Sequence, residues 1–228
     1  QCAQSDGRLF YAAVIPYRRP ADAVAELRRV KALGGAAGVY THGIEWDMPL
    51  SNPEFWPIYE EAARLELPLL IHTGNVSPTL RFMAEGFPRP NKVQFPQNNP
   101  YGSGLNQVLY GVTQLFGSSA MDDFPKLKVA VLEIGSDWVP TFSRELSRTN
   151  FNDWLGDRLF VACAVGDDIT HVVDRVGDDC LITATDYPHG DAFRADHLED
   201  LLTERGDLKS ATIDKILNGN PQRAFVLK

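Results

Sequence analysis

The chain has 228 residues, of which 44% are hydrophobic and 23% are charged, a composition that indicates one globular domain. Its net charge of −8 argues against binding to nucleic acid or to an anionic membrane surface, because no basic stripe is present. No apolar run is long enough to cross a membrane and no signal peptide is visible, so we expect a cytoplasmic protein.

Six short apolar runs have the continuous hydrophobic pattern of strands buried on both faces of a parallel sheet. In chain order they are 9–15, 36–41, 67–73, 127–133, 159–165 and 180–186. Cys163 and Cys180 lie inside such runs. The odd cysteine count of three, without a CxxC spacing, predicts buried thiols in a reducing compartment.

Segments with helical periodicity separate these runs. The segment 21–33 ends at a glycine pair, and 53–66 begins after Asn52, which can cap it. Shorter helices are expected at 168–177 and 210–218. The alternation predicts a parallel α/β sheet, either doubly wound or closed into a barrel. No glycine-rich dinucleotide fingerprint follows any strand, which disfavours the doubly wound alternative.

The stretch 74–126 is the least regular part of the chain. Its portion 86–104 is rich in Pro, Asn and Gly, so we expect an irregular lid or interface arm there. The apolar portion 105–125 is expected to be helical. Residues 76–122 therefore form an insertion over the mouth of the sheet, within one domain that spans 1–228.

Polar residues gather at the carboxyl ends of the predicted strands, which in a (β/α)₈ barrel form the active-site face. They are His42, His72, Glu133 and Asp186. His72 is either a metal ligand or a core histidine whose ring is satisfied by a backbone carbonyl. Asp186 must be paired, metal-bound or protonated, since an isolated buried charge is costly. Alternatively, Asp186 caps the N-terminus of the segment that follows it. For Glu133, the alternative is a salt bridge to a neighbouring arginine.

Four further residues are candidates for binding a substrate. His42 and Trp46 belong to 41-THGIEWD-47, where an aromatic side chain stands among ionisable groups after a strand, although a packed loop would show the same pattern. Asn75 follows His72 closely. His189 is either a residue that contacts and orients the ligand residues of the site or an exposed loop residue.

Three blocks, 38–75, 124–135 and 183–191, resemble the amidohydrolase-related family, whose best-known members are the aminocarboxymuconate-semialdehyde decarboxylases and related aromatic-acid decarboxylases. The segment 216-ILNGNPQRAFVL-227 is similar to the family's terminal signature. The resemblance covers essentially the whole chain in order. It implies a distorted (β/α)₈ TIM barrel that holds one divalent metal, zinc first and manganese second, at its carboxyl face.

The resemblance also implies roles for individual residues. His72 corresponds to the histidine that ends the fifth strand and binds metal. Asp186 corresponds to the aspartate that ends the eighth strand, binds metal and handles protons. We therefore take His72 and Asp186 as metal ligands and Asp186 as catalytic. Glu133 is taken as a second catalytic residue on its own chemistry, because a carboxylate at that strand end can act as a base or as an extra ligand.

Two departures from the family pattern stand out. The family opens with a His-x-His strand, which occurs nowhere in this sequence. The six runs match strands three to eight, so we expect two strands with that histidine pair to precede Gln1. The decarboxylases also end their sixth strand with a catalytic histidine, where this chain has Glu133.

The sequence thus predicts a metal-dependent enzyme in which metal-activated water hydrolyses or decarboxylates a small cyclic or aromatic carboxylic acid. The partner is a small-molecule substrate, and a homodimer is possible. The alternative is a metal-free, non-catalytic barrel that binds a small ligand or a partner subunit.

Overall fold

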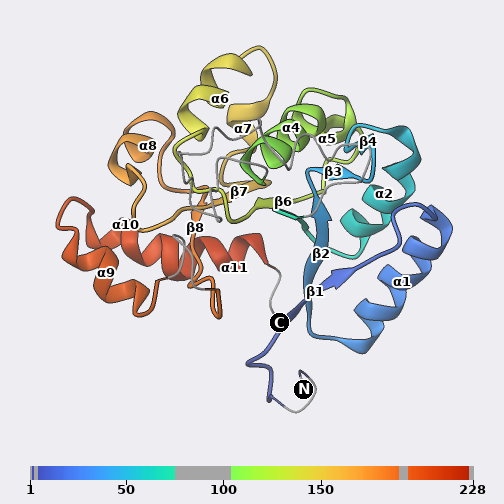
Figure 1. Ribbon diagram of the computed structural model, residues 1–228, viewed down its shortest axis with the longest axis horizontal. Coiled ribbons are helices and arrows are strands. Elements are labelled where there is room, and N and C mark those ends of the chain that lie inside the picture. The colour runs from blue at the N-terminus through green and yellow to red at the C-terminus, as the bar shows by residue number, and fades with distance from the viewer. Residues whose placement is uncertain (1, 3–4, 75–103, 190–194, 226–228) are drawn as a thin grey trace, which may run out of the picture.

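The computed structural model describes residues 2, 5–74, 104–189 and 195–225 (Figure 1). The main sheet within this part has six parallel strands whose spatial order, β1-β2-β5-β6-β7-β8, follows the chain. Their bounds are β1 Tyr11–Val14, β2 Ala36–His42, β5 Leu69–His72, β6 Val129–Val131, β7 Leu159–Ala162 and β8 Leu181–Ile182. The predicted parallel sheet is confirmed, and its uninterrupted order is that of a barrel wall.

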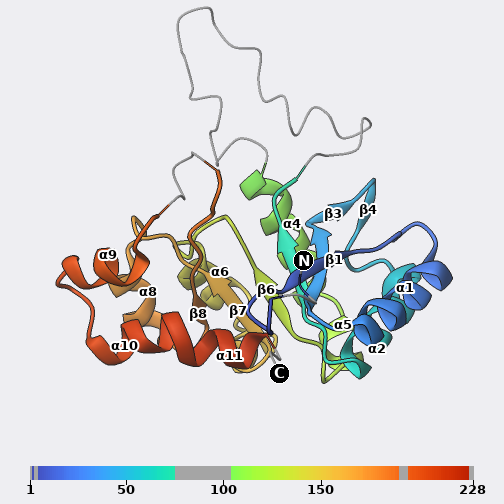
Figure 2. The ribbon, with the colours of Figure 1, turned by 90° about the horizontal axis from the view of Figure 1, so that it is seen from below.

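The helices that connect successive strands cover the outer face of this sheet, while α9, α10 and α11 follow the last strand, β8 (Figures 1 and 2). In chain order the helices are α1 Pro20–Leu33, α2 Trp56–Arg64, α4 Gly104–Phe116, α5 Ala120–Asp123, α6 Val139–Glu145, α7 Phe151–Trp154, α8 Ile169–Val176, α9 Leu198–Glu204, α10 Ser210–Asp214 and α11 Asn220–Ala224. A 3₁₀ turn, η2 Pro53–Phe55, precedes α2, and a π-helical turn, η4 Lys215–Gly219, joins α10 to α11. No helix in the described ranges is long and apolar enough to cross a membrane.

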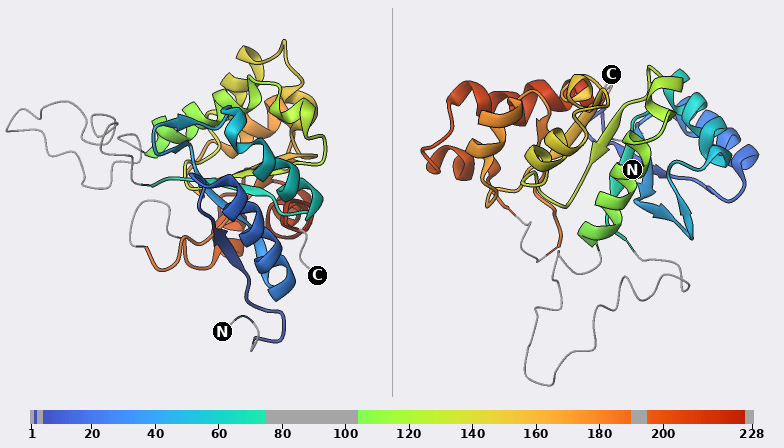
Figure 3. Two further views of the ribbon diagram at one scale, coloured as in Figure 1. Left: turned by 90° about the vertical axis from the view of Figure 1, so that its right-hand side faces the viewer. Right: turned by 90° about the horizontal axis from the view of Figure 1, so that it is seen from above.

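A small antiparallel hairpin, β3 Ile44–Glu45 and β4 Met48–Pro49, follows β2. Helix α4 contacts this hairpin and lies beside it in both views of Figure 3. Close approach is possible because Gly43 and Gly111 have no side chains: a Cβ at Gly43 would overlap the carbonyl oxygen of Gln107. The hairpin replaces the loop that the sequence indicates after His42.

Most predicted elements are present, with altered ends. Helix α1 matches the segment 21–33, and Asn52 caps the next segment by accepting a hydrogen bond from the backbone N–H of Glu54 at 3.0 Å. Apart from β2, which extends one residue further to His42, the strands are shorter than the apolar runs, and the last helical stretch continues to Ala224. The helical prediction for 105–125 is confirmed by α4 and α5. Nearly all of the expected arm at 86–104 lies outside the described residues, and the boundaries of the insertion at 76–122 stay a prediction.

The two faces of the sheet are packed differently. Side chains such as Val39, Ile71 and Val131 point outward into the main core beneath the helices. The inner face carries a second, smaller cluster, comprising Leu70, Ala130, Phe160, Ala162, Ile182 and, from α11, Ala224. Burial on both faces explains why the strands are continuously apolar.

Candidate metal and catalytic site

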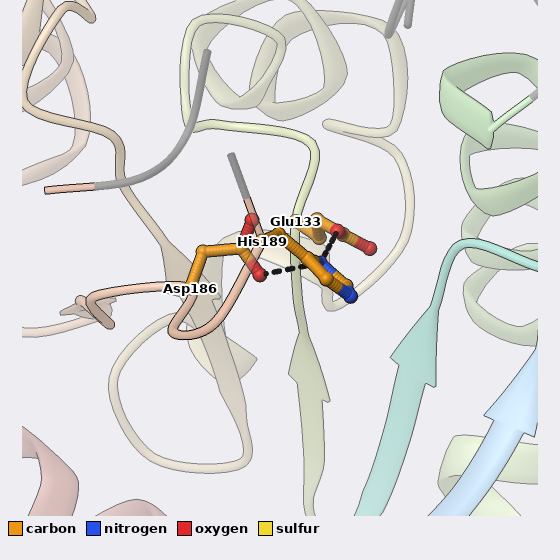
Figure 4. A group of neighbouring side chains, drawn as sticks. All are labelled: Glu133, Asp186 and His189. Carbon is orange, nitrogen blue, oxygen red and sulfur yellow. Dashed lines mark ion pairs between the residues drawn. The ribbon is translucent and has the colours of Figure 1, made fainter. Parts of the chain in front are cut away.

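Two carboxylates and two imidazoles meet at the carboxyl ends of β5, β6 and β8. His72 Nε2 lies 3.0 Å from Glu133 Oε2. The ring of His189 lies between the two acids, its Nδ1 3.1 Å from Asp186 Oδ1 and 3.5 Å from Glu133 Oε1 (Figure 4). The structure therefore brings His72, Glu133 and Asp186 to one place, and adds His189 as a contacting side chain.

Each of these residues is presented at or just after the end of a strand. His72 is the last residue of β5, while Glu133 and Asp186 stand on the loops that follow β6 and β8. Both acids have left-handed backbones, with φ of 61° at Glu133 and 53° at Asp186. Such backbone conformations are costly for residues other than glycine and are concentrated at functional sites. Both residues stand beyond the last residue of their strand, Val131 for β6 and Ile182 for β8.

The site opens into a cavity of about 130 Å³. Its polar wall is formed by His72, Glu133 and Asp186, and its apolar wall includes Leu132, Ala162 and Cys163. A larger hollow of about 280 Å³ lies at the opposite end of the sheet, beside Pro68, Lys128 and Arg158 just before the starts of β5, β6 and β7. Of these two cavities within the described residues, the smaller is the one where acids and imidazoles converge, so we assign the chemistry to it.

The charges in the site stabilise one another. The hydrogen bond from His72, aided by one from Thr73 Oγ1, lowers the pKa of Glu133 to about 2 against the opposing effect of burial. Burial lowers the pKa of His72, but the hydrogen bond with Glu133 and the other local interactions outweigh it, so that the pKa is raised overall. Glu133 is consequently an ionised carboxylate. Burial also raises the pKa of the Cys163 thiol to about 12.

The donor set suits a divalent cation. Ligand atoms of Glu133, Asp186 and His189 all lie within 4.8 Å of one another, and His72 Nε2 adjoins Glu133. Carboxylate oxygens and imidazole nitrogens are the ligands that Zn²⁺ and Mn²⁺ take in proteins. The residues present therefore fit a metal, although the roles of His72 and Asp186 as ligands stay predictions.

The remaining predicted residues lie in different places. His42 ends β2 beside His72, its partner in strand register. Trp46, in the turn of the β3–β4 hairpin, is 48% exposed and packs against the guanidinium of Arg18 at 4.1 Å; it is not among the residues that line the cavity. Asn75 lies outside the described residues.

Two contributors were missed by the sequence analysis. Tyr40 lies between His42 and His72, and its hydroxyl donates to the carbonyl oxygen of Thr73 at 2.9 Å. Thr73 in turn donates its own hydroxyl to Glu133. A signal for Tyr40 was available, because residues two apart on a strand face the same side and His42 was already a candidate.

The profile of one protein family, described as amidohydrolase, matches residues 1–227. The chain belongs to the amidohydrolase family. The resemblance drawn from the sequence blocks, and the barrel architecture that it implies, are thereby confirmed, and the curated relatives are enzymes.

Individual relatives are distant but similar over the whole chain. The gamma-resorcylate decarboxylase of a Rhizobium species is 21% identical over 249 residues, covering 100% of this chain and 73% of that protein. The crystal structure of an amidohydrolase from Mycobacterium avium subsp. paratuberculosis has a TM-score of 0.74 at 19% identity, covering 96% of this chain and 58% of that one.

A third relative is a dihydroxybenzoic acid decarboxylase from a Polaromonas species, whose structure contains manganese and the inhibitor 2-nitroresorcinol. It has a TM-score of 0.74 at 19% identity, and covers 99% of this chain and 71% of that one. The chain thus spans between 58% and 73% of the length of these three relatives.

Proposed function

We propose that this chain is a metal-dependent carboxy-lyase that removes CO₂ from a small aromatic carboxylic acid. The observation that carries the proposal is the convergence of His72, Glu133 and Asp186 on one cavity, with His189 in contact with both acids. The decarboxylase names of two of the three relatives support the reaction class.

His72 and Asp186 are the proposed metal ligands. Zinc is the first candidate and manganese the second, the latter supported by the metal in the Polaromonas relative. A bound divalent cation would neutralise carboxylate charge and act as a Lewis acid toward an oxygen of the substrate. The remaining chemistry falls to side chains of this chain.

Proton transfer is assigned to His189 and Glu133. Loss of CO₂ from an aromatic ring requires a proton at the ring carbon as the carbon–carbon bond breaks. The Nδ1 of His189 lies between oxygens of Asp186 and Glu133, so an N–H there has two acceptors and the ring is held against the two acids that line the cavity. His189 donates this proton to the ring carbon, and Glu133 passes a replacement from solvent. The decarboxylases carry their catalytic histidine at the position of Glu133, after β6. In this chain, we propose that His189, on the loop after β8, supplies the imidazole.

Hydrolysis is the second candidate, favoured by one observation. Glu133 is an ionised carboxylate that lines the cavity, and only the ionised form can accept a proton from a water molecule that attacks a carbonyl carbon; its lowered pKa makes it a weaker base than an ordinary glutamate. The two reactions leave different solvent labels. Decarboxylation in D₂O places deuterium on the carbon that lost CO₂, whereas hydrolysis in H₂¹⁸O places ¹⁸O in the released acid.

The test begins with the metal content of the purified protein, measured by mass spectrometry. The protein is then incubated with 2,6-dihydroxybenzoate in D₂O and, separately, with an aromatic lactone in H₂¹⁸O. Asp186→Asn should lose metal and activity, while Asp153→Asn, at an exposed position on α7, should retain both. Deuterium incorporation supports the lyase and ¹⁸O incorporation the hydrolase. A folded protein that takes up neither zinc nor manganese overturns the proposal and favours the metal-free binding barrel.

A further inference from the structure

A second polar cluster adjoins the candidate site on the inner face of β2. Tyr40 and His42 pair in register with Leu70 and His72 of β5, so their side chains lie on the same face as His72. Neither residue lines the cavity beside Glu133 and Asp186. Their contacts lead instead to His72 and to the carbonyl oxygen of Thr73.

The outer end of this cluster is Glu45, whose side chain is only 8% exposed. One oxygen, Oε1, accepts hydrogen bonds from the hydroxyl of Thr41 at 2.9 Å and from the backbone N–H of His42 at 2.8 Å. The same oxygen lies 3.3 Å from His42 Nδ1. A buried carboxylate with these contacts fixes both the backbone and the ring of His42.

Tyr40 connects His42 to the strand that carries His72. Its ring stands perpendicular to that of His42, with centroids 5.1 Å apart, and lies 5.4 Å from the ring of His72. The Tyr40 hydroxyl is 3.4 Å from His42 Nε2 and donates to the carbonyl oxygen of Thr73 at 2.9 Å.

The carbonyl oxygen of Thr73 links the cluster to the site, because both Tyr40 and His72 contact it. His72 Nδ1 lies 2.7 Å from the same oxygen. Because a carbonyl can only accept, Nδ1 must carry a hydrogen, and Nε2 is then the atom directed at Glu133. Thr73 also donates its hydroxyl to Glu133, so its two polar groups hold the two neighbouring site residues.

The backbone at Gly74, the residue after Thr73, lies in close contact with this cluster. A Cβ at Gly74 would overlap the His42 ring, and it would come within 3.3 Å of the Tyr40 hydroxyl. Only glycine at this position lets the ring of His42 close against the chain.

We propose that Glu45, His42 and Tyr40 form a hydrogen-bonded bracket that fixes the Thr73 carbonyl and thereby directs His72 Nε2 toward the metal position. The three are positioning residues, and the inference rests on the proposed metal site. Groups that orient a metal-binding imidazole through its second nitrogen change metal affinity by about 10–100-fold when removed.

Tyr40→Phe tests the bracket because it removes only the hydroxyl. We expect the dissociation constants for Zn²⁺ and Mn²⁺, measured by competition with a chelator, to rise about tenfold. Gly74→Ala, which displaces the His42 ring, should have the same effect. Tyr110→Phe, at an exposed position on α4, should leave both constants unchanged. Unchanged affinity in Tyr40→Phe, in a protein whose wild type binds metal, overturns the bracket and leaves the proposed function standing.

A second measurement tests the bracket in metal-free protein, through the hydrogen exchange of the His72 ring. In protein with ¹⁵N-labelled histidine, the Nδ1–H of His72 should give a slowly exchanging NMR signal, and Tyr40→Phe should accelerate its exchange with solvent. If exchange is equally fast in wild type and variant, the bracket is wrong whether or not the protein binds metal. If wild type binds no metal but exchange differs, the bracket orients His72 as described and the proposed function fails.

Discussion

His72 and Glu133 stand at the ends of neighbouring parallel strands and meet with Nε2 and Oε2 3.0 Å apart. The contact keeps Glu133 ionised beside the cavity and directs His72 inward. Replacing Glu133 would remove both its interaction with His72 and any proton transfer that it performs. Its roles in stability and in chemistry therefore have to be separated experimentally.

Glu133→Gln preserves the shape of the side chain and removes its charge. If Glu133 transfers protons, turnover should fall by about 10²–10⁴-fold with little change in melting temperature. Both quantities are measured on the same variant, with Glu204→Gln on the surface of α9 as control. Full turnover together with a lower melting temperature would remove Glu133 from the catalytic residues and leave it as a structural partner of His72.

The ion pairs of Glu61 predict how stability depends on pH. The Glu61 carboxylate is 7% exposed and is bound by Arg64 and Arg28, whose hydrogen bonds lower its pKa to about 2. Because its pKa is lower in the folded state, its contribution is present near neutrality and is lost as pH falls from about 4.5 toward 2.

Glu61→Gln should therefore reduce the free energy of unfolding at pH 7 by about 1–2 kcal/mol, since both arginines are largely exposed and solvent screens the pairs. The difference from wild type should shrink toward pH 2. Urea unfolding at several pH values measures it, with Glu60→Gln, exposed on the same helix, as the matched control. A difference that stays constant with pH would show that the ion pairs are not its source.

Asp167 anchors the loop that carries Glu133. Its Oδ2 accepts hydrogen bonds from the N–H and hydroxyl of Ser136, at 2.7 and 2.9 Å, and from the N–H of Ala164 at 2.9 Å. Asp167→Ala leaves these donors without the acceptor and should cost about 1–3 kcal/mol of stability. Turnover should also fall, because the Glu133 loop loosens. Thermal unfolding and kinetics check this, and equal stability would contradict the anchoring role.

Gly43→Ala should be one of the most damaging small substitutions in the chain. The new methyl group would overlap the carbonyl of Gln107, so α4 would have to move away from the β3–β4 hairpin. We expect a loss of more than about 3 kcal/mol, or failure to fold. Gly166→Ala, where a Cβ meets nothing within 4 Å, is the control. Similar expression yields and melting temperatures for the two variants would refute the close packing.

The order of strands and helices was predictable from sequence because buried parallel strands read as unbroken apolar runs. The strand ends were not, since pairing stops at Val131 in β6 and at Ile182 in β8 while the residues that follow remain apolar or small. The β3–β4 hairpin was missed because its strands have only two residues each, too few for any periodicity.

The site was predictable to the extent that its residues end strands. His72, Glu133 and Asp186 each follow an apolar run, and the carboxyl ends of parallel strands share one edge. His189 could not be placed in advance, because its direction depends on the turn in which its N–H donates to the carbonyl of Asp186 at 2.9 Å. Trp46 was a candidate for substrate binding because it lies among ionisable residues after a strand. In the structure its ring packs against the guanidinium of Arg18.

The left-handed backbone at Glu133 has an evolutionary consequence. Glycine adopts such a conformation freely, whereas a glutamate there costs the fold about 1 kcal/mol. Selection for stability alone would therefore drive this position toward glycine, and a descendant released from its chemical task should drift in that direction. Among sequences of this type, glycine at position 133 would mark lineages that have abandoned the reaction, and a retained acid those still under selection for it.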